Sequence, residues 1–146
     1  MVRNFLEVSV ETFVNATEDE DRVVTAVKNL LGRELPEDFE IRYVEGTHGN
    51  PIGVLRVSYR RSREVKALIN HLRQQSYWKW LVSEAGPRMD ESQVLHFRID
   101  KQKALRGEYE LWTMGEAIKV KIKIATYPSS REEAIRLFEN TADEPI

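Results

Sequence analysis

The residues with the clearest chemical potential form an alternation of apolar and cationic side chains over residues 118–124. Strict period-two alternation predicts a strand with one buried face, because successive side chains of a strand point to opposite sides. Lys119, Lys121 and Lys123, here called the lysine comb, would project together from the other face, about 7 Å apart. That spacing is close to the phosphate repeat of a nucleic-acid backbone and indicates a phosphate-binding surface. A second interpretation stays open, in which the lysines protect an exposed or edge strand from aggregation.

A second cationic cluster lies in the segment 100–107, shortly before the comb. Asp100 can cap one helical turn and Gly107 can end it, which accounts for the two ends of the segment. Capping does not account for the cations between them, which are candidates for phosphate contact, together with one neutral amide. These candidates are Lys101, Gln102, Lys103 and Arg106.

A third basic run crosses a predicted strand end and the start of a helix. The unpaired N–H groups at a helix N-terminus suit phosphate, and the surrounding cations would add to that attraction. Glu64 lies within the run, so solvated surface ion pairs are the alternative use of these side chains. The run comprises Arg56, Arg60, Arg61, Arg63 and Lys66, of which the last four are taken as candidate contacts.

The charge distribution is more informative than the net charge of −2. Residues 1–50 hold 5 Lys/Arg and 11 Asp/Glu, whereas residues 51–124 hold 15 Lys/Arg and 8 Asp/Glu. Residues 125–146 hold 2 Lys/Arg and 5 Asp/Glu. A basic middle between acidic ends can present a local cationic field on a protein that is acidic as a whole.

Length and composition bound the class of protein. A chain of 146 residues fits one domain over residues 1–146 with an ordinary hydrophobic core. No apolar run approaches a membrane span and no signal segment opens the chain, so we expect a cytoplasmic protein without a membrane partner. Because cysteine is absent, disulfides, cysteine nucleophiles and thiolate metal sites are excluded.

Motifs for catalysis are missing from the sequence. The three histidines His48, His71 and His96 are scattered without metal-ligand spacing. There is no glycine-rich phosphate loop, nucleophile elbow or dinucleotide fingerprint. We therefore expect no enzyme, no cofactor and no metal site. The alternative is a metal-dependent nuclease with acids drawn from separate strands.

The periodicities predict an α+β domain with an antiparallel-rich mixed sheet and helices packed on it. Its element order is β-α-β-β-α-β-β-β-α, with hairpins joining the second strand to the third and the fifth to the sixth. The expected strands are 5–14, 39–45, 52–60, 93–99, 109–112 and 118–125. The expected helices are 17–31, 62–84 and 130–138, and the tail at 139–146 is expected to fray.

Several local details accompany these elements. Thr17 and Glu20 have the spacing of a capping box at the start of the first helix. In the first strand, Leu6 is expected on the core face. In a continuous helix over 62–84, Trp80 would pack in the core, whereas Trp78 would project to nearly the opposite face. There Trp78 would cover another element, form a dimer contact or stack on a base.

Two motifs occur in a characteristic order and separation: Gly46-x-His48-Gly49-Asn50-Pro51-Ile52 and Asp100-Lys101-Gln102-x-Ala104-x-x-Gly107. Together they resemble an archaeal RNA-binding domain family described as exosome-associated, whose fold is similar to that of the ribosomal protein that binds 5S rRNA. The resemblance covers nearly the whole chain and implies RNA binding, without a particular RNA or reaction. His48 and Asn50 can hydrogen-bond a phosphate or base edge, although a structural use of Asn50 in the turn is the alternative.

These observations favour a noncatalytic RNA-binding domain, with an RNA-processing or degradation complex as an implied partner. Its expected surface joins the lysine comb to the segment 100–107 and extends to the basic run at 60–66. The second hypothesis is a protein-interaction or scaffold module, with a homodimer as one form, whose acidic termini meet basic partners.

Overall fold

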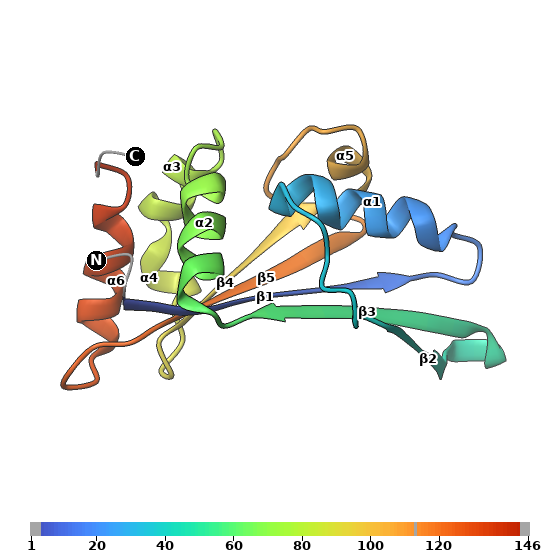
Figure 1. Cartoon of the computed structure of the whole chain (residues 1–146), viewed down its shortest axis with the longest axis horizontal. Coiled ribbons are helices and arrows are strands. Elements are labelled where there is room, and N and C mark those ends of the chain that lie inside the picture. Colours follow the sequence, from blue (N-terminus) through green and yellow to red (C-terminus); the bar gives the residue numbers. More distant parts are fainter. Residues whose placement is uncertain (1–3, 113, 144–146) are drawn as a thin grey trace.

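The computed structural model describes residues 4–112 and 114–143. One sheet carries the helices together on one of its faces (Figure 1). The strands are β1 (Phe5–Val14), β2 (Ile41–Glu45), β3 (Pro51–Tyr59), β4 (Val94–Asp100) and β5 (Ala117–Ile124). The helices are α1 (Glu20–Leu31), α2 (Ser62–Leu72), α3 (Trp78–Ser83), α4 (Ala85–Arg88), α5 (Lys101–Leu105) and α6 (Arg131–Asn140), and a 3-10 turn, η2 (Thr47–Gly49), joins β2 to β3.

The five strands lie in the order β2-β3-β1-β5-β4, and each neighbouring pair is antiparallel. The expected single α+β domain with helices on a sheet is confirmed, and so is the β2–β3 hairpin. The expected mixture of parallel and antiparallel pairs is wrong for the described strands. β5, which carries the lysine comb, is paired on both sides, with β1 and with β4. It is therefore an interior strand.

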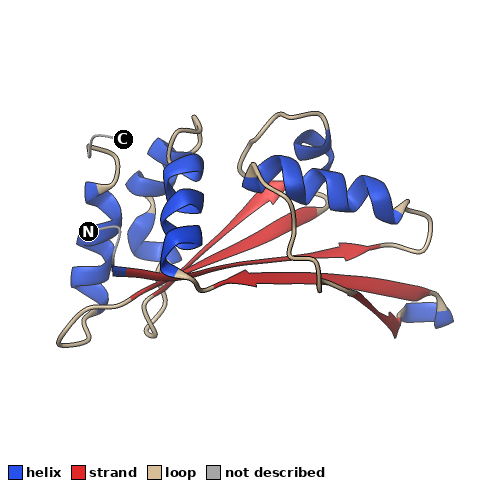
Figure 2. Ribbon diagram, viewed as in Figure 1, coloured by secondary structure: helices blue, strands red, loops and turns tan. Residues whose placement is uncertain are grey.

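The hydrophobic core fills the space between the sheet and the helical layer (Figure 2). Alternate side chains of β5 enter this core, as the period-two pattern predicted, and α1 and α2 close it with their apolar stripes. These buried residues are Ile118, Val120, Ile122 and Ile124 from β5, Val23, Val27, Leu30 and Leu31 from α1, and Val65, Leu68, Ile69 and Leu72 from α2. In the described part of the chain, no helix covers the opposite face of the sheet.

The start of α1 differs from the predicted capping box. Asp19, rather than Thr17, is the N-cap, and its carboxylate accepts the backbone N–H of Asp21 at 2.9 Å. Thr17 precedes the helix because the chain makes a turn there before α1 begins at Glu20. Gly32 ends the helix with a φ of +66°, a left-handed conformation that glycine adopts without a Cβ penalty.

The predicted continuous helix over 62–84 is wrong, because the chain leaves α2 and turns before α3. This turn changes the angular phase between Leu72 and the two tryptophans that follow. Trp78 is therefore buried, with 2% of its surface exposed, and its indole N–H donates to the Thr141 hydroxyl at 2.8 Å. Trp80, which an unbroken helix would bury, is 66% exposed. Trp78 thus joins α3 to the end of α6.

Two strand predictions also differ from the structure. Among the described residues the last predicted hairpin does not form: Leu111 forms a single antiparallel bridge to Ile99, and β5 pairs with β1 and β4 instead. Residues 4–112 and 114–143 consequently contain one strand fewer than the sequence predicted. In β1 the pairing register shifts between Phe5 and Glu7, which buries Phe5 and leaves Leu6 at the surface. Leu6 is therefore not a core residue.

The C-terminal segment is ordered further than the predicted frayed tail at 139–146. Ser130 caps α6 through its hydroxyl, and the helix continues to Asn140. Thr141 is buried beneath Trp78. This contact explains why the helix end is held against α3. The last predicted tail residues, 144–146, lie outside the described part of the chain.

Candidate nucleic-acid interface

The lysine comb stands on the uncovered face of the sheet. Because β5 turns its isoleucines and Val120 into the core, Lys119, Lys121 and Lys123 project to the other side. Within residues 4–112 and 114–143, none of their ammonium groups makes a hydrogen bond or an ion pair. Protection of an unpaired edge does not explain these lysines, since β5 has hydrogen-bonded neighbours on both sides.

The neighbouring strand β4 adds to the cationic character of this face. Arg98 lies opposite Lys119 in the antiparallel register, and His96 lies opposite Lys121. Side chains directly opposite each other start about 5 Å apart at their Cβ atoms, so the fields of Arg98 and Lys119 add. Arg98 thus extends the comb sideways across the sheet.

Two carboxylates of β1 lie on the uncovered face, and an arginine of or next to β3 holds each of them. Glu11 lies opposite Lys119 on one side and Arg56 on the other, and the Nε–H of Arg56 donates to it at 2.7 Å. Glu7 forms the same kind of pair with Arg60. Both acids are therefore drawn toward β3 and away from the comb. The candidate Arg60 lies on this face with its guanidinium engaged by Glu7.

Aromatic rings border the comb at its Lys119 end. The guanidinium of Arg98 lies over the Trp112 ring, 5.3 Å from the centroid, and Trp112 Nε1–H donates to the carbonyl of Gly115 at 2.6 Å. Phe13 of β1 points to the same face and is 49% exposed. Phe13, Trp112 and Lys119 line one groove. Cationic and aromatic groups therefore meet at this end of the comb.

Sequence reasoning missed Arg98, Phe13 and Trp112 as members of this surface. For two of these three residues, the sequence contains a pattern that could have identified them. The alternation of residues 94–99 places Arg98 on the polar face of its strand, and Phe13 is a large apolar residue at a polar-face position of β1. Trp112 comes from a loop, and its place beside β4 depends on the Leu111 bridge, which no local pattern predicts.

Lys101 is a structural residue, which corrects its prediction as an RNA contact. It is 3% exposed, and its ammonium donates to the Phe13 carbonyl and the Glu18 carboxylate, both at 2.8 Å. Glu116 lies 3.1 Å from the same ammonium. Partial burial raises the pKa of Glu116, but hydrogen bonds from Lys101 and Gln102 outweigh this effect and lower it. The cluster fastens α5 to the end of β1, to the turn before α1 and to the residue that precedes β5.

The other cations of the 100–107 segment lie on a different side of the molecule from the comb. Lys103 is paired with Glu110, and the guanidinium of Arg106 lies 3.8 Å from Glu108. Gln102 is exposed and donates to a carboxylate at 3.2 Å. α5 packs against α1 in the helical layer (Figure 1). The segment and the comb therefore do not form the single surface expected from the sequence.

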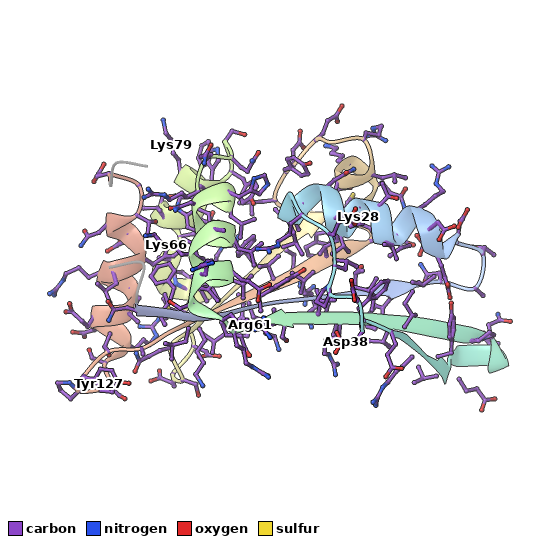
Figure 3. All side chains as sticks on the ribbon, viewed as in Figure 1. Lys28, Asp38, Arg61, Lys66, Lys79 and Tyr127 are labelled. Atoms are coloured by element: carbon purple, nitrogen blue, oxygen red, sulfur yellow. The ribbon has the colours of Figure 1, made fainter. Side chains whose placement is uncertain are left out.

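The basic run at the start of α2 curves away from the sheet. Arg61 is the N-cap residue of the helix, and Figure 3 shows it close to the strand layer, with Lys66 higher on α2. Arg61, Arg63 and Lys66 are exposed and have no side-chain partner among the described residues. Of this run, Arg56 and Arg60 of the strand end share the comb's face. RNA contact by the other three stays a prediction.

His48 and Asn50 lie in the turn at the outer end of the β2–β3 hairpin (Figure 1). The Asn50 carbonyl accepts the N–H of Gly46 at 2.8 Å, which closes the turn, and His48 has a φ of +66°. Both residues are exposed. Because β3 and β1 separate this turn from β5, the turn is not part of the comb. RNA contact there stays a prediction.

An acid and a histidine border the comb on the β4 side. His96 Nε2 lies 2.8 Å from Asp90 Oδ2. Partial burial raises the pKa of Asp90, but hydrogen bonds from His96 and from two backbone amides outweigh it and lower the pKa. Across residues 4–112 and 114–143, no group of three or more histidines and acids is arranged to hold a metal ion. No helix in the same residues has the length and apolar character needed to cross a bilayer.

Comparison with known proteins identifies the family. A family described as RNA binding matches residues 7–124, so the chain belongs to it. The RNA-binding protein PAB1135 of Pyrococcus abyssi is 33% identical over 135 residues, which cover 88% of each chain.

Two solved structures of DUF54 proteins are similar over nearly their full length. Mth689 of Methanothermobacter thermautotrophicus is 34% identical with a TM-score of 0.79, and the match covers 93% of this chain and 96% of that one. AF2318 of Archaeoglobus fulgidus is 37% identical with a TM-score of 0.77, covering 91% and 96%. The arrangement of a five-stranded sheet under helices is therefore shared with these archaeal proteins.

Proposed function

We propose that this member of the RNA-binding family binds RNA without cleaving it, and that the uncovered sheet face is its contact surface. The observation that carries the proposal is the unpartnered lysine comb on an interior strand. Three ammonium groups in a row, none of which is paired with a carboxylate of the described residues, are available for phosphate oxygens. Arg98 and the arginines that hold Glu7 and Glu11 support this assignment, because they keep the local charge positive.

Phosphate contacts would supply most of the affinity. Lys and Arg that neutralise phosphates release condensed counterions, so binding weakens as salt rises. Such contacts fix the register of the RNA and carry no sequence information, which must come from base contacts or RNA shape. The proposed surface therefore binds many RNAs at low salt and discriminates among them through groups beside the comb.

Association with RNA-processing or degradation machinery is the finer part of this proposal. The sequence resemblance implies it, together with a fold similar to the 5S rRNA-binding ribosomal protein. The exposed cations of α2, among them Lys66, and the acidic ends of the chain offer surfaces away from the comb for a partner protein. Affinity capture with and without nuclease would separate partners held through RNA from partners that bind the protein directly.

The direct test is fluorescence anisotropy with nucleic-acid-free protein, using labelled structured and single-stranded RNAs across a salt series. We expect Kd values in the micromolar range or below at low salt that rise steeply with salt. The same RNAs incubated with protein and Mg²⁺ should stay intact on a denaturing gel. Absence of binding at low salt would overturn the proposal, and Mg²⁺-dependent cleavage would favour the nuclease hypothesis.

The protein-interaction module is the second candidate, and one feature of the sheet favours it. β2 is an edge strand, and Tyr43 and Val44 leave about half of their side chains exposed on it. Exposed, apolar edge strands can pair with a second copy of the chain. Light scattering would detect such a dimer. A dimer that binds no RNA would place this candidate first.

A further inference from the structure

Resting on the proposed function, we infer that the uncovered sheet face binds single-stranded RNA, with unstacked bases placed on Trp112 and Phe13. The lysine comb alone does not determine whether the bound RNA is single-stranded or duplex. Two partly exposed aromatic rings among the cations of the face favour the single strand.

The two rings lie on either side of Lys119. Phe13 comes from β1 and Trp112 from the loop that crosses the β4 edge, and both line the same groove with Lys119. A neighbouring groove shares Trp112 and Lys119 and continues along the comb to Lys121 and His96. A chain of nucleotides following these grooves would meet rings at one end and lysines along its length.

Rings in this position suit unpaired bases and have little use against a duplex. In an RNA duplex the bases are paired and stacked inside, and the major groove is too deep and narrow for side chains to read. A duplex on a sheet surface would present phosphates and ribose to Phe13 and Trp112. A single strand can turn its bases onto aromatic rings while its phosphates meet lysines, which is the usual combination in single-strand binding.

The contact between Arg98 and Trp112 adds a second stacking element. The Arg98 Cζ atom lies 5.3 Å from the Trp112 ring centroid, and Trp112 is only half-buried. Bases stack on arginine guanidinium groups as well as on aromatic rings. The Arg98–Trp112 pair can therefore extend into a stack of three groups when a base is bound. The hydrogen bond from Trp112 to Gly115 holds the indole in place for this contact.

The test compares one labelled oligonucleotide as a single strand and annealed to its complement, at the same ionic strength. Wild-type protein is expected to bind the single strand at least about tenfold more tightly. Trp112→Ala should weaken single-strand binding by about five- to a hundredfold, the range for loss of one stacked base, and change duplex binding less than twofold. The matched control is Trp80→Ala, because Trp80 is exposed on α3 in the helical layer. It should leave both affinities unchanged.

Trp112→Phe separates stacking from loop structure, because phenylalanine keeps a ring but loses the hydrogen bond to Gly115. Binding close to wild type by Trp112→Phe, with loss in Trp112→Ala, supports stacking. Equal losses of single-strand affinity in both variants would mean that binding depends on the loop structure and not on the aromatic ring. That result would overturn the inference.

The inference and the proposed function fail in distinguishable ways. Duplex binding as tight as single-strand binding, with normal salt dependence and no effect of Trp112→Ala, would overturn the single-strand inference and leave RNA binding by the comb intact. Absence of salt-dependent binding to both oligonucleotides would overturn the two together. An added readout is tryptophan fluorescence in a Trp80→Phe background. Stacking on Trp112 should quench it when the single strand is added, and Trp112→Phe should abolish the quenching.

Discussion

Glu11 of β1 and Arg56 of β3 lie opposite each other on the uncovered sheet face and form an ion pair, with 2.7 Å between Arg56 Nε and Glu11 Oε2. The pair holds the carboxylate toward β3. On the other side of Glu11, Lys119 has no carboxylate partner within residues 4–112 and 114–143. The cationic surface therefore depends on how its acids are held as well as on its lysines.

Glu11→Gln should tighten RNA binding by about two- to fivefold at low salt. The substitution removes a negative charge next to Lys119 and frees Arg56 for phosphate. The free energy of unfolding should change by about 1 kcal/mol or less, because Arg56 is well exposed and surface pairs contribute little. Anisotropy and urea unfolding measure the two effects. Glu132→Gln, on α6, is the matched control, and weaker RNA binding by Glu11→Gln would contradict the account.

Lys101→Met should destabilise the fold by about 2–4 kcal/mol, since it leaves two carboxylates facing each other beside a buried position. This expected loss of stability lies toward the lower end of the range for a broken buried ion pair, because Glu116 is partly exposed to solvent. Lys103→Met, on the same short helix, should destabilise the fold far less than Lys101→Met, because the Lys103–Glu110 pair is at the surface. Urea unfolding checks both. A stable Lys101→Met protein with weakened RNA binding would restore Lys101 as an RNA contact.

Hydrophobic periodicity predicted the strands and helices that keep one face buried along their whole length. The alternation over 118–124 gave β5 and the direction of its lysines, because a strand has only two faces. Charge alone did not distinguish Lys101 from Lys121. Lys101 is enclosed by Glu18 and Glu116, which come from other segments of the chain, whereas Lys121 faces solvent. Clustering in sequence therefore gave candidates, and only the packing of α5 separated the structural lysine from those of the comb.

Asp90→Asn should flatten the acid limb of the stability profile. The folded-state pKa of Asp90 lies below its ordinary value of 3.8, so the carboxylate stabilises the fold above that pH. This contribution is lost as the pH falls through the lower folded-state pKa. Asparagine can still accept the backbone amides but carries no charge. Thermal unfolding between about pH 5 and pH 2 should fall less steeply for the variant.

Asp38→Asn is the control for this profile, since Asp38 is an exposed loop residue in Figure 3. Parallel acid limbs for wild type and Asp90→Asn would show that the contact between His96 and Asp90 does not contribute to folding stability.

Thr141→Val should cost about 1–3 kcal/mol of unfolding free energy, because it leaves the buried indole N–H of Trp78 without an acceptor. Trp80→Ala should change stability by less than about 0.5 kcal/mol, as expected for an exposed side chain. Thermal or urea unfolding measures both. The reverse ranking would support the continuous helix expected from sequence.

The exchange of roles between Trp78 and Trp80 shows where periodicity fails. A helical stripe extends only as far as the helix is unbroken, and the chain turns after Leu72 without glycine or proline to signal it. Burial of Trp78 then depends on Thr141 and Phe138, which follow some 60 residues later. Contacts between distant segments decided this part of the fold, and they have no local signature.

The most direct test of the account is the salt dependence of RNA binding after the comb is neutralised. The triple variant Lys119→Gln, Lys121→Gln, Lys123→Gln should reduce the log–log slope by about two to three units, because each lysine that meets a phosphate contributes about 0.7 to 0.9. The control neutralises Lys28 and Lys79, which Figure 3 shows on the helical layer, together with Arg22, an exposed residue of α1. Its slope should change by less than one unit. An unchanged slope in the comb variant, or an equal change in the control, would contradict the assignment of RNA to the uncovered sheet face.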